Sequence, residues 1–221
     1  MANTDARRNP SAPQADPALL ETLRGLAVAL LSDNLHRSIG STGLQPYHRP
    51  KPMAGTAVTV RTRGGDNLAI LRAFEYCRPG DVMVVDCGGD ITNAVVGGIL
   101  TYYGATIQLS GMVVDGAIRD VAEIRERDFP VYARGVNHRG PYKDGPGAIN
   151  VPVSIGGMVV NPGDIIVGDQ DGLLAFDASL APMLIAKAQA QARKEAETMQ
   201  AMKEGRWDRS FIAALEARAA N

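Results

Sequence analysis

Two adjacent residues of opposite charge, Arg119 and Asp120, are the strongest candidates for chemistry in this chain. They follow an apolar run that begins at Met112 and turns at Asp115-Gly116, after which the spacing becomes helical. This pattern predicts a strand that ends in a charged turn, where α/β proteins commonly place ligand-binding residues. Because neighbouring residues at a helix start point in different directions, we expect one side chain to hold an anion and the other a cation. A plain salt bridge at the helix start is the alternative.

A second candidate site is the pair Gly97 and Gly98, which opens an expected helix containing Ile99 and Leu100. A helix start has free backbone N–H groups and a dipole that favours an anion, and glycines leave room for one. The segment is therefore a candidate cradle for a carboxylate or a phosphate. Its spacing matches neither G-x-G-x-x-G nor a P-loop, and close packing of the helix is the alternative.

Composition limits the possible classes of protein. The net charge is -1 and Lys and Arg form no block, so nucleic acid is not expected as a direct partner. No run of eighteen apolar residues is present and residues 1–17 lack the apolar core of a signal peptide, so we expect a cytoplasmic protein without a membrane segment. Cys77 and Cys87 do not form a C-x-x-C motif and are interpreted as buried small apolar residues. His36 and His48 lack a second metal ligand at suitable spacing and are interpreted as surface or outer-shell residues.

The chain divides into three expected parts. Residues 1–16 have the composition of a flexible N-terminal arm, residues 17–177 form one α/β domain, and residues 178–221 form a C-terminal helical extension. The α/β domain is predicted from two successive units of strand, glycine-rich loop and helix, with strands at 81–86 and from 112 onwards. It begins with one helix that runs from Pro17 to about residue 34.

The second half of the domain is expected to be largely β-structure. A strand near residues 129–134 is followed by a long loop, residues 135–152, in which His138, Arg139 and Lys143 are interpreted as solvated, although they could approach a site. Residues 151–176 alternate short apolar runs with turns, which is typical of antiparallel hairpins. Asp169 and Asp171 belong to one such turn, because the other ligands of a calcium loop are absent.

The helix predicted from about residue 178 to residue 203 carries few large apolar residues and needs something else to pack on. In a homo-oligomer it could reach a neighbouring subunit. Glu195 or Glu197 could then contribute to that subunit's site.

The spacing of the candidate residues resembles a family signature. Gly98, twenty intervening residues, Arg119-Asp120, two residues and Glu123 resemble the G-x20-R-D-x2-E/D pattern of the RraA-like proteins, which include the 4-hydroxy-4-methyl-2-oxoglutarate aldolases of aromatic catabolism. The resemblance extends over roughly residues 20–200, through segments such as Pro79-Gly80-Asp81 and Arg139-Gly140-Pro141. It implies a swivelling β/β/α domain with a central sheet, flanking helices and a long C-terminal helix, assembled into homotrimers or homohexamers with sites between subunits.

The resemblance also implies roles for individual residues. Asp120 would bind Mg²⁺ or Mn²⁺, and Arg119 would contact the oxo-acid substrate. The backbone amides of Gly97, Gly98, Ile99 and Leu100 would bind the substrate carboxylate. Glu195 of a neighbouring subunit would lie near the water shell of the metal.

These roles suit a class II lyase. Cleavage of a 4-hydroxy-2-oxo-acid releases pyruvate as its enolate, and a dication with a guanidinium stabilises the developing negative charge. The same enolate forms when oxaloacetate loses CO₂, so decarboxylase activity is an expected companion.

One position departs from the family pattern. Many members have an acidic residue in a G-E-L-L segment, where this chain has Gly98 in G-G-I-L. The departure leaves room for a different oxo-acid or for a protein that no longer catalyses aldol cleavage. The alternative function is a non-enzymatic RraA-type regulator that binds an RNA-degradation enzyme, although the long C-terminal extension favours an enzyme. A menaquinone methyltransferase is disfavoured, because no glycine-rich nucleotide loop is present.

Overall fold

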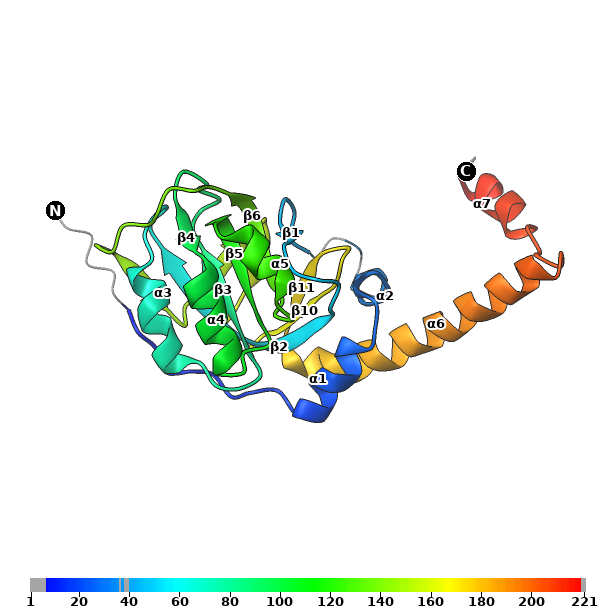
Figure 1. Ribbon diagram of the computed structural model, residues 1–221. Helices are drawn as coiled ribbons and strands as arrows, with labels where there is room; N and C mark the ends of the chain where they lie inside the picture. The colour runs from blue at the N-terminus through cyan, green and yellow to red at the C-terminus, as the bar shows by residue number, and fades with distance from the viewer. Residues whose placement is uncertain (1–6, 36, 38–39, 220–221) are drawn as a thin grey trace.

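The computed structural model of the protein describes residues 7–35, 37 and 40–219 (Figure 1). Its centre is a nine-stranded mixed sheet with the order β1-β6-β5-β3-β2-β10-β11, in which β4 pairs with β5 and β7 with β2, while β8 and β9 form a separate pair. The strands are β1 (Gln45–Pro46), β2 (Met53–Thr62), β3 (Asp81–Asp86), β4 (Ala94–Val96), β5 (Gly111–Ile118), β6 (Val131–Val136), β7 (Gly147–Ile149), β8 (Val153–Ile155), β9 (Met158–Val160), β10 (Ile165–Gly168) and β11 (Leu173–Phe176).

Helices flank this sheet and extend beyond it. The α-helices are α1 (Pro17–Arg24), α2 (Val28–Asp33), α3 (Leu68–Ala73), α4 (Gly98–Thr106), α5 (Val121–Glu126), α6 (Ala181–Lys203) and α7 (Phe211–Ala219), and short 3-10 turns cover Phe74–Tyr76 and Ala178–Leu180. The mixed α/β architecture, the central sheet and the long C-terminal helix agree with the fold predicted from the sequence.

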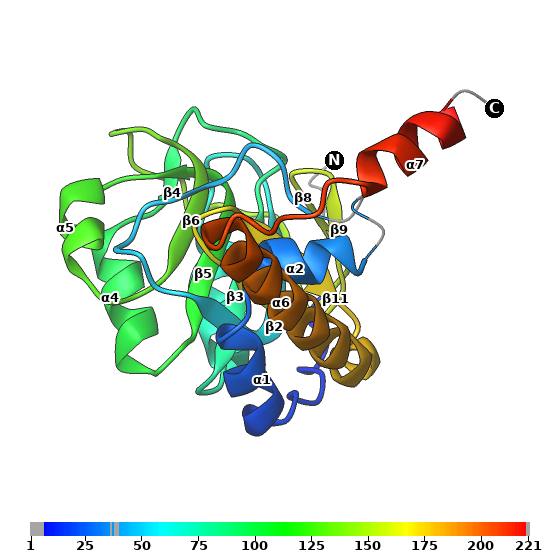
Figure 2. The same ribbon diagram turned by 90° about the vertical axis from the view of Figure 1, so that its right-hand side faces the viewer.

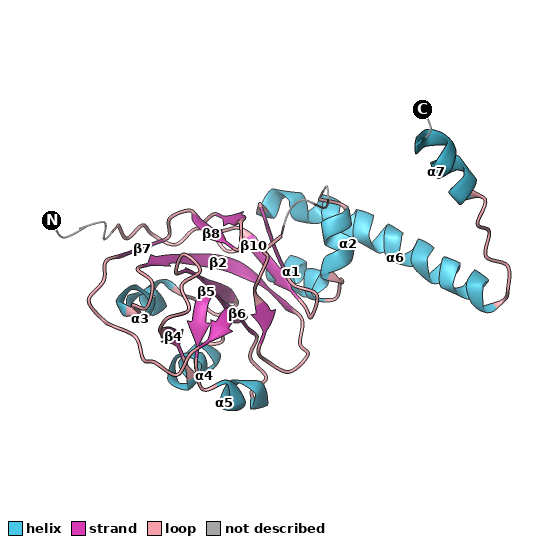
Figure 3. Cartoon of the chain, turned by 90° about the horizontal axis from the view of Figure 1, so that it is seen from above, coloured by secondary structure: helices cyan, strands magenta, loops and turns pink. Residues whose placement is uncertain are grey.

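The parallel centre of the sheet explains where a site can form. Strands β2, β3, β5 and β6 are parallel neighbours, and α3, α4 and α5 connect them along one face (Figure 3). Strand β5 is buried along its whole length, since helices cover it on one side and the β8–β9 pair lies towards the other. The loops after the parallel strands therefore meet at one edge, as expected for an α/β fold.

A separate apolar cluster lies at the end of the sheet formed by β10 and β11. There α1, α2 and the first turns of α6 pack on β10 and β11 through side chains such as Leu23, Leu31, Ile165 and Leu184 (Figure 2). Beyond Ala188, α6 has no fully buried residue and projects away from the domain (Figure 1). No helix in the described part of the chain is both long and apolar enough to cross a membrane.

The single helix predicted from Pro17 to about residue 34 is wrong, because the chain breaks after Arg24. Gly25 ends α1, where the Gly25 N–H donates to the Thr22 carbonyl at 3.2 Å and the Leu26 N–H donates to the Leu23 carbonyl at 3.0 Å. The N–H of Val28 then donates to Asp169 Oδ2 at 2.8 Å, so a carboxylate from a distant turn caps α2. The apolar spacing continued across the break and concealed it.

The predicted turn at Asp115-Gly116 is also wrong, because both residues lie inside β5. Pairing with β6 shifts register between Val114 and Ala117, which is a β-bulge or a related irregularity. Asp115 is buried, and its carboxylate accepts hydrogen bonds from Arg134 Nε at 2.5 Å and from the Gly156 N–H at 2.7 Å. The charged turn of the strand therefore begins only at Arg119.

The described part of the expected N-terminal arm is attached to the domain. Ser11 Oγ donates to the carbonyl of Tyr76 at 2.7 Å, and the Ala15 N–H donates to Thr56 Oγ1 at 3.0 Å. Residues 1–6 of the arm and His36 lie outside the described residues.

The two cysteines and His48 are buried or half-buried. Cys87 is buried and Cys77 is half-buried, and both are free thiols whose burial raises the pKa, that of Cys77 to about 12. His48 is not a surface residue. It is buried, its pKa is lowered by burial, and its ring contacts the backbone of Val131 and Lys51.

Candidate active site

Arg119 and Asp120 lie where β5 ends and α5 begins, as the sequence predicted. The N–H of Arg119 donates to the carbonyl of Val96 at 3.0 Å, which joins this turn to the end of β4. Asp120 has φ 59° and ψ 36°, a left-handed conformation that is uncommon for residues other than glycine. Its side chain therefore does not cap α5 and turns instead towards α4.

The carboxylate of Asp120 meets the first turn of α4. Its Oδ2 accepts a hydrogen bond from the N–H of Gly98 at 2.8 Å. A Cβ at Gly97 would lie 2.6 Å from the same oxygen and 3.0 Å from Arg119 Cγ, so a side chain at position 97 does not fit. This close approach accounts for the glycine at position 97.

Arg119 and Asp120 do not point in separate directions, contrary to the expectation from the sequence. Arg119 Nε lies 3.7 Å from Asp120 Oδ2, which is a loose ion pair. The left-handed backbone of Asp120 causes this, because it swings the carboxylate back beside the preceding side chain. Each side chain keeps 43% of its surface exposed, so both groups remain open to a ligand.

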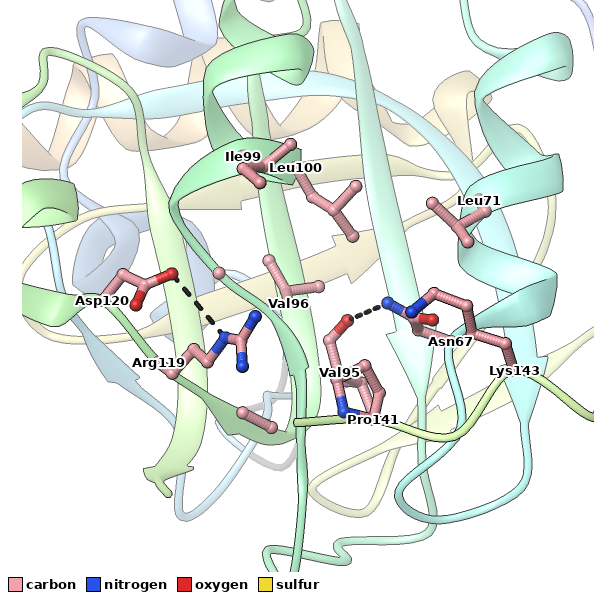
Figure 4. Close-up of a pocket in the computed structure, with 12 residues that line it drawn as sticks. Asn67, Leu71, Val95, Val96, Ile99, Leu100, Arg119, Asp120, Pro141 and Lys143 are labelled. Atoms are coloured by element: carbon pink, nitrogen blue, oxygen red, sulfur yellow. Dashed lines mark hydrogen bonds and ion pairs between the residues drawn. The ribbon is translucent and has the colours of Figure 1, made fainter. Parts of the chain in front are cut away.

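These two residues border a pocket of about 200 Å³ (Figure 4). The pocket lies between the first turns of α3 and α4, and its lining residues are Asn67, Leu71, Ala94, Val95, Val96, Gly97, Ile99, Leu100, Arg119, Asp120, Pro141 and Lys143. The predicted binding residues Gly97, Ile99 and Leu100 therefore share one pocket with Arg119 and Asp120.

Gly98 is the exception among the predicted anion-binding residues, because Asp120 already uses its N–H. In the part of the chain that the structure describes, the N–H groups of Ile99 and Leu100 have no hydrogen-bond partner. They belong to the first turn of a nine-residue helix, where the dipole favours an anion. These two amides are thus available for the anion-binding site predicted from the sequence.

The opposite side of the pocket carries two polar residues that sequence reasoning missed or misplaced. Asn67 is buried, and its Nδ2 donates to the Val95 carbonyl at 3.1 Å, whereas its Oδ1 has no partner among the described residues. Figure 4 shows Lys143 extending towards Asn67 across from Arg119. Lys143 therefore lines the pocket. No sequence signal connected Asn67, which precedes α3, with the start of α4 at Gly98.

Asp66 holds the loop that brings Lys143 to the pocket. Its carboxylate accepts hydrogen bonds from the N–H groups of Asp144 at 2.7 Å and Gly145 at 3.0 Å, and from that of Leu68 at 2.9 Å. His138 and Arg139 from the preceding part of the loop do not line this pocket.

Glu123, the last residue of the signature, occupies the space beside Gly98. A Cβ at Gly98 would overlap the Glu123 carboxylate, which forms an ion pair with Arg127. Arg127 Nη1 in turn donates to the Gly98 carbonyl at 2.6 Å and to Thr101 Oγ1 at 3.0 Å. A carboxylate from α5 thus fills the space in which a side chain at position 98 would lie.

Glu195 is not brought to this pocket within one chain. It lies on the exposed part of α6 and accepts a hydrogen bond from Gln191 Nε2 at 3.0 Å. Its predicted role, like that of Glu197, depends on a neighbouring copy.

A divalent cation would have a single protein ligand here. Among the described residues, no group of three or more His, Cys, Asp or Glu side chains gathers as a metal site. Asp120 nevertheless fits such an ion, because Oδ2 is held by Gly98 while the carboxylate stays 43% exposed. Mg²⁺ commonly takes only one or two carboxylates and completes its shell with water and substrate.

Comparison with known proteins identifies the family. The model of the RraA-like family, described as Aldolase/RraA, matches residues 28–175. A protein of Halalkalibacterium halodurans named putative 4-hydroxy-4-methyl-2-oxoglutarate aldolase is 37% identical over 176 residues, which cover 79% of this chain and 84% of that protein. A protein of Burkholderia multivorans with the same name is 37% identical over 137 residues, covering 62% and 83%.

Comparison with solved structures gives the same family. Streptomyces coelicolor RraAS2, described as an unusual member of the RNase ES inhibitor RraA protein family, superposes with a TM-score of 0.78 at 27% identity and covers 85% of this chain and 98% of that one. An uncharacterized Pseudomonas syringae protein gives a TM-score of 0.77 at 25% identity, over 89% and 96%. The chain therefore belongs to the RraA-like family of aldolases and RraA proteins.

Proposed function

We propose that the protein is a divalent-metal-dependent carbon–carbon lyase that cleaves a 4-hydroxy-2-oxo-acid to pyruvate, with oxaloacetate decarboxylation as a side activity. The observation that carries the proposal is the arrangement around Asp120. Its carboxylate is fixed by the N–H of Gly98, beside the guanidinium of Arg119 and the first turn of α4. Relatives named putative 4-hydroxy-4-methyl-2-oxoglutarate aldolases support this choice of substrate class.

In this proposal each group has a separate task. The free N–H groups of Ile99 and Leu100 bind the substrate carboxylate at the head of α4. Arg119 donates hydrogen bonds to the C2 oxygen and stabilises the negative charge that develops there as the C3–C4 bond breaks. The C4 hydroxyl loses its proton to water as its carbon becomes a carbonyl, and the enolate takes a proton from water at C3 to give pyruvate. Asp120 holds Mg²⁺ or Mn²⁺ by its exposed carboxylate. A divalent ion supplies Lewis-acid polarisation of the oxo group when bound.

The surrounding pocket positions the substrate. Leu71, Leu100 and Pro141 provide apolar walls, which strengthen the interaction of Arg119 with a charged oxygen once a bound substrate has displaced water from the pocket. The pocket of about 200 Å³ is small for a complete ligand site. We propose that a neighbouring copy in a homotrimer or homohexamer completes it and that the Glu195 of that copy lies near the metal.

The test is pyruvate release from 4-hydroxy-4-methyl-2-oxoglutarate and from oxaloacetate, with Mg²⁺, with Mn²⁺ and with EDTA. Wild type should turn over only with a metal, and Asp120→Ala should lose at least about 10²-fold in kcat, as expected when a charge-stabilising group is removed. Glu126→Ala is the matched control, because it removes an exposed carboxylate at the C-terminal end of α5, the helix that Asp120 precedes, and Glu126 lies outside the pocket. Equal rates for the two variants, or turnover in EDTA, would contradict the proposal.

The second candidate function is a regulator that binds an RNA-degradation enzyme. The structural similarity to RraAS2, described as a member of the RNase ES inhibitor family, favours it. Inhibition of an RNase ES-type ribonuclease by the purified protein, without turnover of either oxo-acid, would support this second function.

A further inference from the structure

Lys143 lines the candidate active site on the side opposite Arg119 and Asp120 (Figure 4). Among the residues that the structure describes, its ammonium group forms no hydrogen bond or ion pair. Arg119 differs in this respect, because its Nε lies 3.7 Å from the Asp120 carboxylate. An unpaired cation therefore borders the pocket on the side away from the candidate metal ligand.

The backbone on either side of Lys143 is held by the segment that precedes α3. The N–H of Asn67 donates to the Tyr142 carbonyl at 3.0 Å. On the other side of the lysine, the N–H of Asp144 donates to the buried carboxylate of Asp66 at 2.7 Å. The backbone of Lys143 is thus positioned before a ligand binds, while its exposed side chain is free to turn towards one.

A buried hydrogen-bond acceptor on the same wall has no partner. Asn67 is only 6% exposed, and its Nδ2 donates to the Val95 carbonyl at 3.1 Å. Because a carbonyl only accepts hydrogen bonds, the amide must present Nδ2 to Val95 and turn Oδ1 elsewhere. Oδ1 has no partner among the described residues, and a buried unpaired acceptor is costly. Figure 4 shows Lys143 extending towards this amide, so a change of lysine rotamer would bring a donor to Oδ1.

The charges around the pocket are unbalanced. Among the described residues that line it, Asp120 is the one acidic residue, whereas Arg119 and Lys143 are both cations. A divalent ion at Asp120, as proposed above, adds two further positive charges. A 2-oxo-acid with a single carboxylate therefore leaves an excess of positive charge in the site.

A second carboxylate on the ligand would reduce this excess where the cation is unpaired. Arg119 and the first turn of α4 take the oxo-acid end of the ligand in the proposed function, so the far end of the ligand faces the wall that carries Lys143 (Figure 4). A hydrogen bond from an ammonium to a carboxylate is about twice as strong as one between neutral groups. The apolar walls of the pocket strengthen it further once the ligand has displaced water.

We propose, on the basis of the lyase function above, that Lys143 is the specificity-determining residue of this site and binds the distal carboxylate of a dicarboxylic 2-oxo-acid. The ammonium group has three N–H donors, of which one donates to Asn67 Oδ1 and the others to the carboxylate. Asn67 is thus a positioning residue that acts through Lys143. A monocarboxylic 2-oxo-acid of the same chain length leaves Lys143 without an anionic partner and binds more weakly.

The experiment is calorimetric titration of the full-length protein with 2-oxoglutarate and with 2-oxopentanoate, in the presence of Mg²⁺. The two compounds have the same chain length and differ only in the distal carboxylate, and neither has the 4-hydroxyl group that the proposed cleavage requires. Wild type should bind 2-oxoglutarate at least about tenfold more tightly, because of the charge-assisted hydrogen bonds. Lys143→Met should lose this preference and keep the wild-type affinity for 2-oxopentanoate. Asn67→Ala should lower the preference by about threefold, again without weakening 2-oxopentanoate.

Lys187→Met is the matched control, because Lys187 is an exposed lysine of α6 outside the pocket and its loss changes the net charge equally. It should keep the wild-type preference, and circular dichroism establishes that each variant is folded.

The proposal is overturned if wild type does not bind 2-oxoglutarate, binds the two compounds equally, or keeps its preference in Lys143→Met. Equal weakening of both compounds in Asn67→Ala overturns the positioning role of Asn67, since damage to the pocket has that effect. Pyruvate release tests the lyase function separately. A preference that depends on Lys143, without turnover of a 4-hydroxy-2-oxo-acid, would contradict the lyase function alone, whereas turnover without the preference would contradict the role of Lys143 alone.

Discussion

The Asp120 carboxylate accepts a hydrogen bond from the Gly98 N–H at 2.8 Å. The residue that precedes α5 therefore binds a backbone N–H in the first turn of α4. This contact fixes the orientation of the candidate metal ligand, and Arg119 lies beside it. It also requires a left-handed backbone at Asp120, a conformation that commonly marks functional sites when it occurs outside glycine.

The first prediction concerns Gly97, where an added Cβ would lie 2.6 Å from Asp120 Oδ2. Gly97→Ala should displace the carboxylate and lower kcat by about 100-fold, since misplacing a catalytic group by about 1 Å has effects of that size. The rate of pyruvate release at steady state gives kcat for the variant and for wild type. Gly25→Ala is the control, because its Cβ would meet only the Thr22 carbonyl at 3.4 Å. Wild-type activity of folded Gly97→Ala would contradict the assigned geometry.

The second prediction concerns the space shared by Gly98 and Glu123. Gly98→Ala should destabilise the fold by about 1–3 kcal/mol, because the methyl group would overlap the Glu123 carboxylate in a filled space. Glu123→Ala removes that carboxylate, so the double variant should recover most of the loss. Urea denaturation of the four proteins gives the coupling free energy. Additive losses would show that the two side chains do not compete for one space.

The third prediction concerns Glu195 on the projecting helix α6. If Glu195 completes the pocket of a neighbouring copy, Arg119→Ala and Glu195→Ala are each impaired, but their mixture forms intact sites at some interfaces. After unfolding and refolding together in equal amounts, about a quarter of wild-type activity should return, because each site needs one suitable copy on either side. Glu197→Ala replaces Glu195→Ala in the control mixture. Recovery no greater than the sum of the separate activities would place Glu195 outside the site.

The fourth prediction concerns pH and the buried residue Asp66. Burial raises the pKa of this carboxyl, but three backbone N–H donors and Arg63 outweigh burial and hold the pKa below its ordinary value. A lowered folded-state pKa contributes stability that is present above the unfolded-state pKa, about 3.9, and is lost as pH falls through the folded-state pKa. Wild type should therefore lose stability in urea titrations as pH falls below about 4.

Asp66→Asn should remove this part of the pH dependence and destabilise the protein at pH 7 by about 1–3 kcal/mol, because buried N–H groups lose an acceptor. It should also raise KM for the oxo-acid, since the loop that carries Lys143 is released. Asp171→Asn, at an exposed turn, is the control. If Asp66→Asn loses stability at low pH as wild type does, other carboxylates govern the loss of stability in acid.

The sequence was sufficient for the placement of Arg119 and Asp120, because a buried strand followed by helical spacing locates the edge where such residues lie. It was not sufficient for their mutual orientation. The positive φ of Asp120 accompanies the tertiary contact with Gly98, and although Asp adopts this conformation more readily than most residues, nothing in the spacing indicates it at this position. The break after Arg24 was hidden for a related reason, since the cap on Val28 comes from Asp169.

The other side of the pocket was the harder part to predict. Asn67 reaches it only because β4 runs beside the start of α3, and Lys143 only because Asp66 fastens its loop. Both depend on contacts between segments far apart in sequence, which spacing patterns do not record. Residues held by one local turn were therefore predictable, whereas those assembled from separate loops were not.

The most direct test of the metal site is a Mn²⁺ titration monitored by electron paramagnetic resonance, with pyruvate present. Wild type should bind about one Mn²⁺ per chain, and Asp120→Asn should bind it at least about tenfold more weakly, since the neutral amide is a poorer ligand for a hard dication. Glu126→Asn is the control and should bind as wild type does. Equal affinity of wild type and Asp120→Asn for Mn²⁺ would contradict the assignment of Asp120 as the metal ligand.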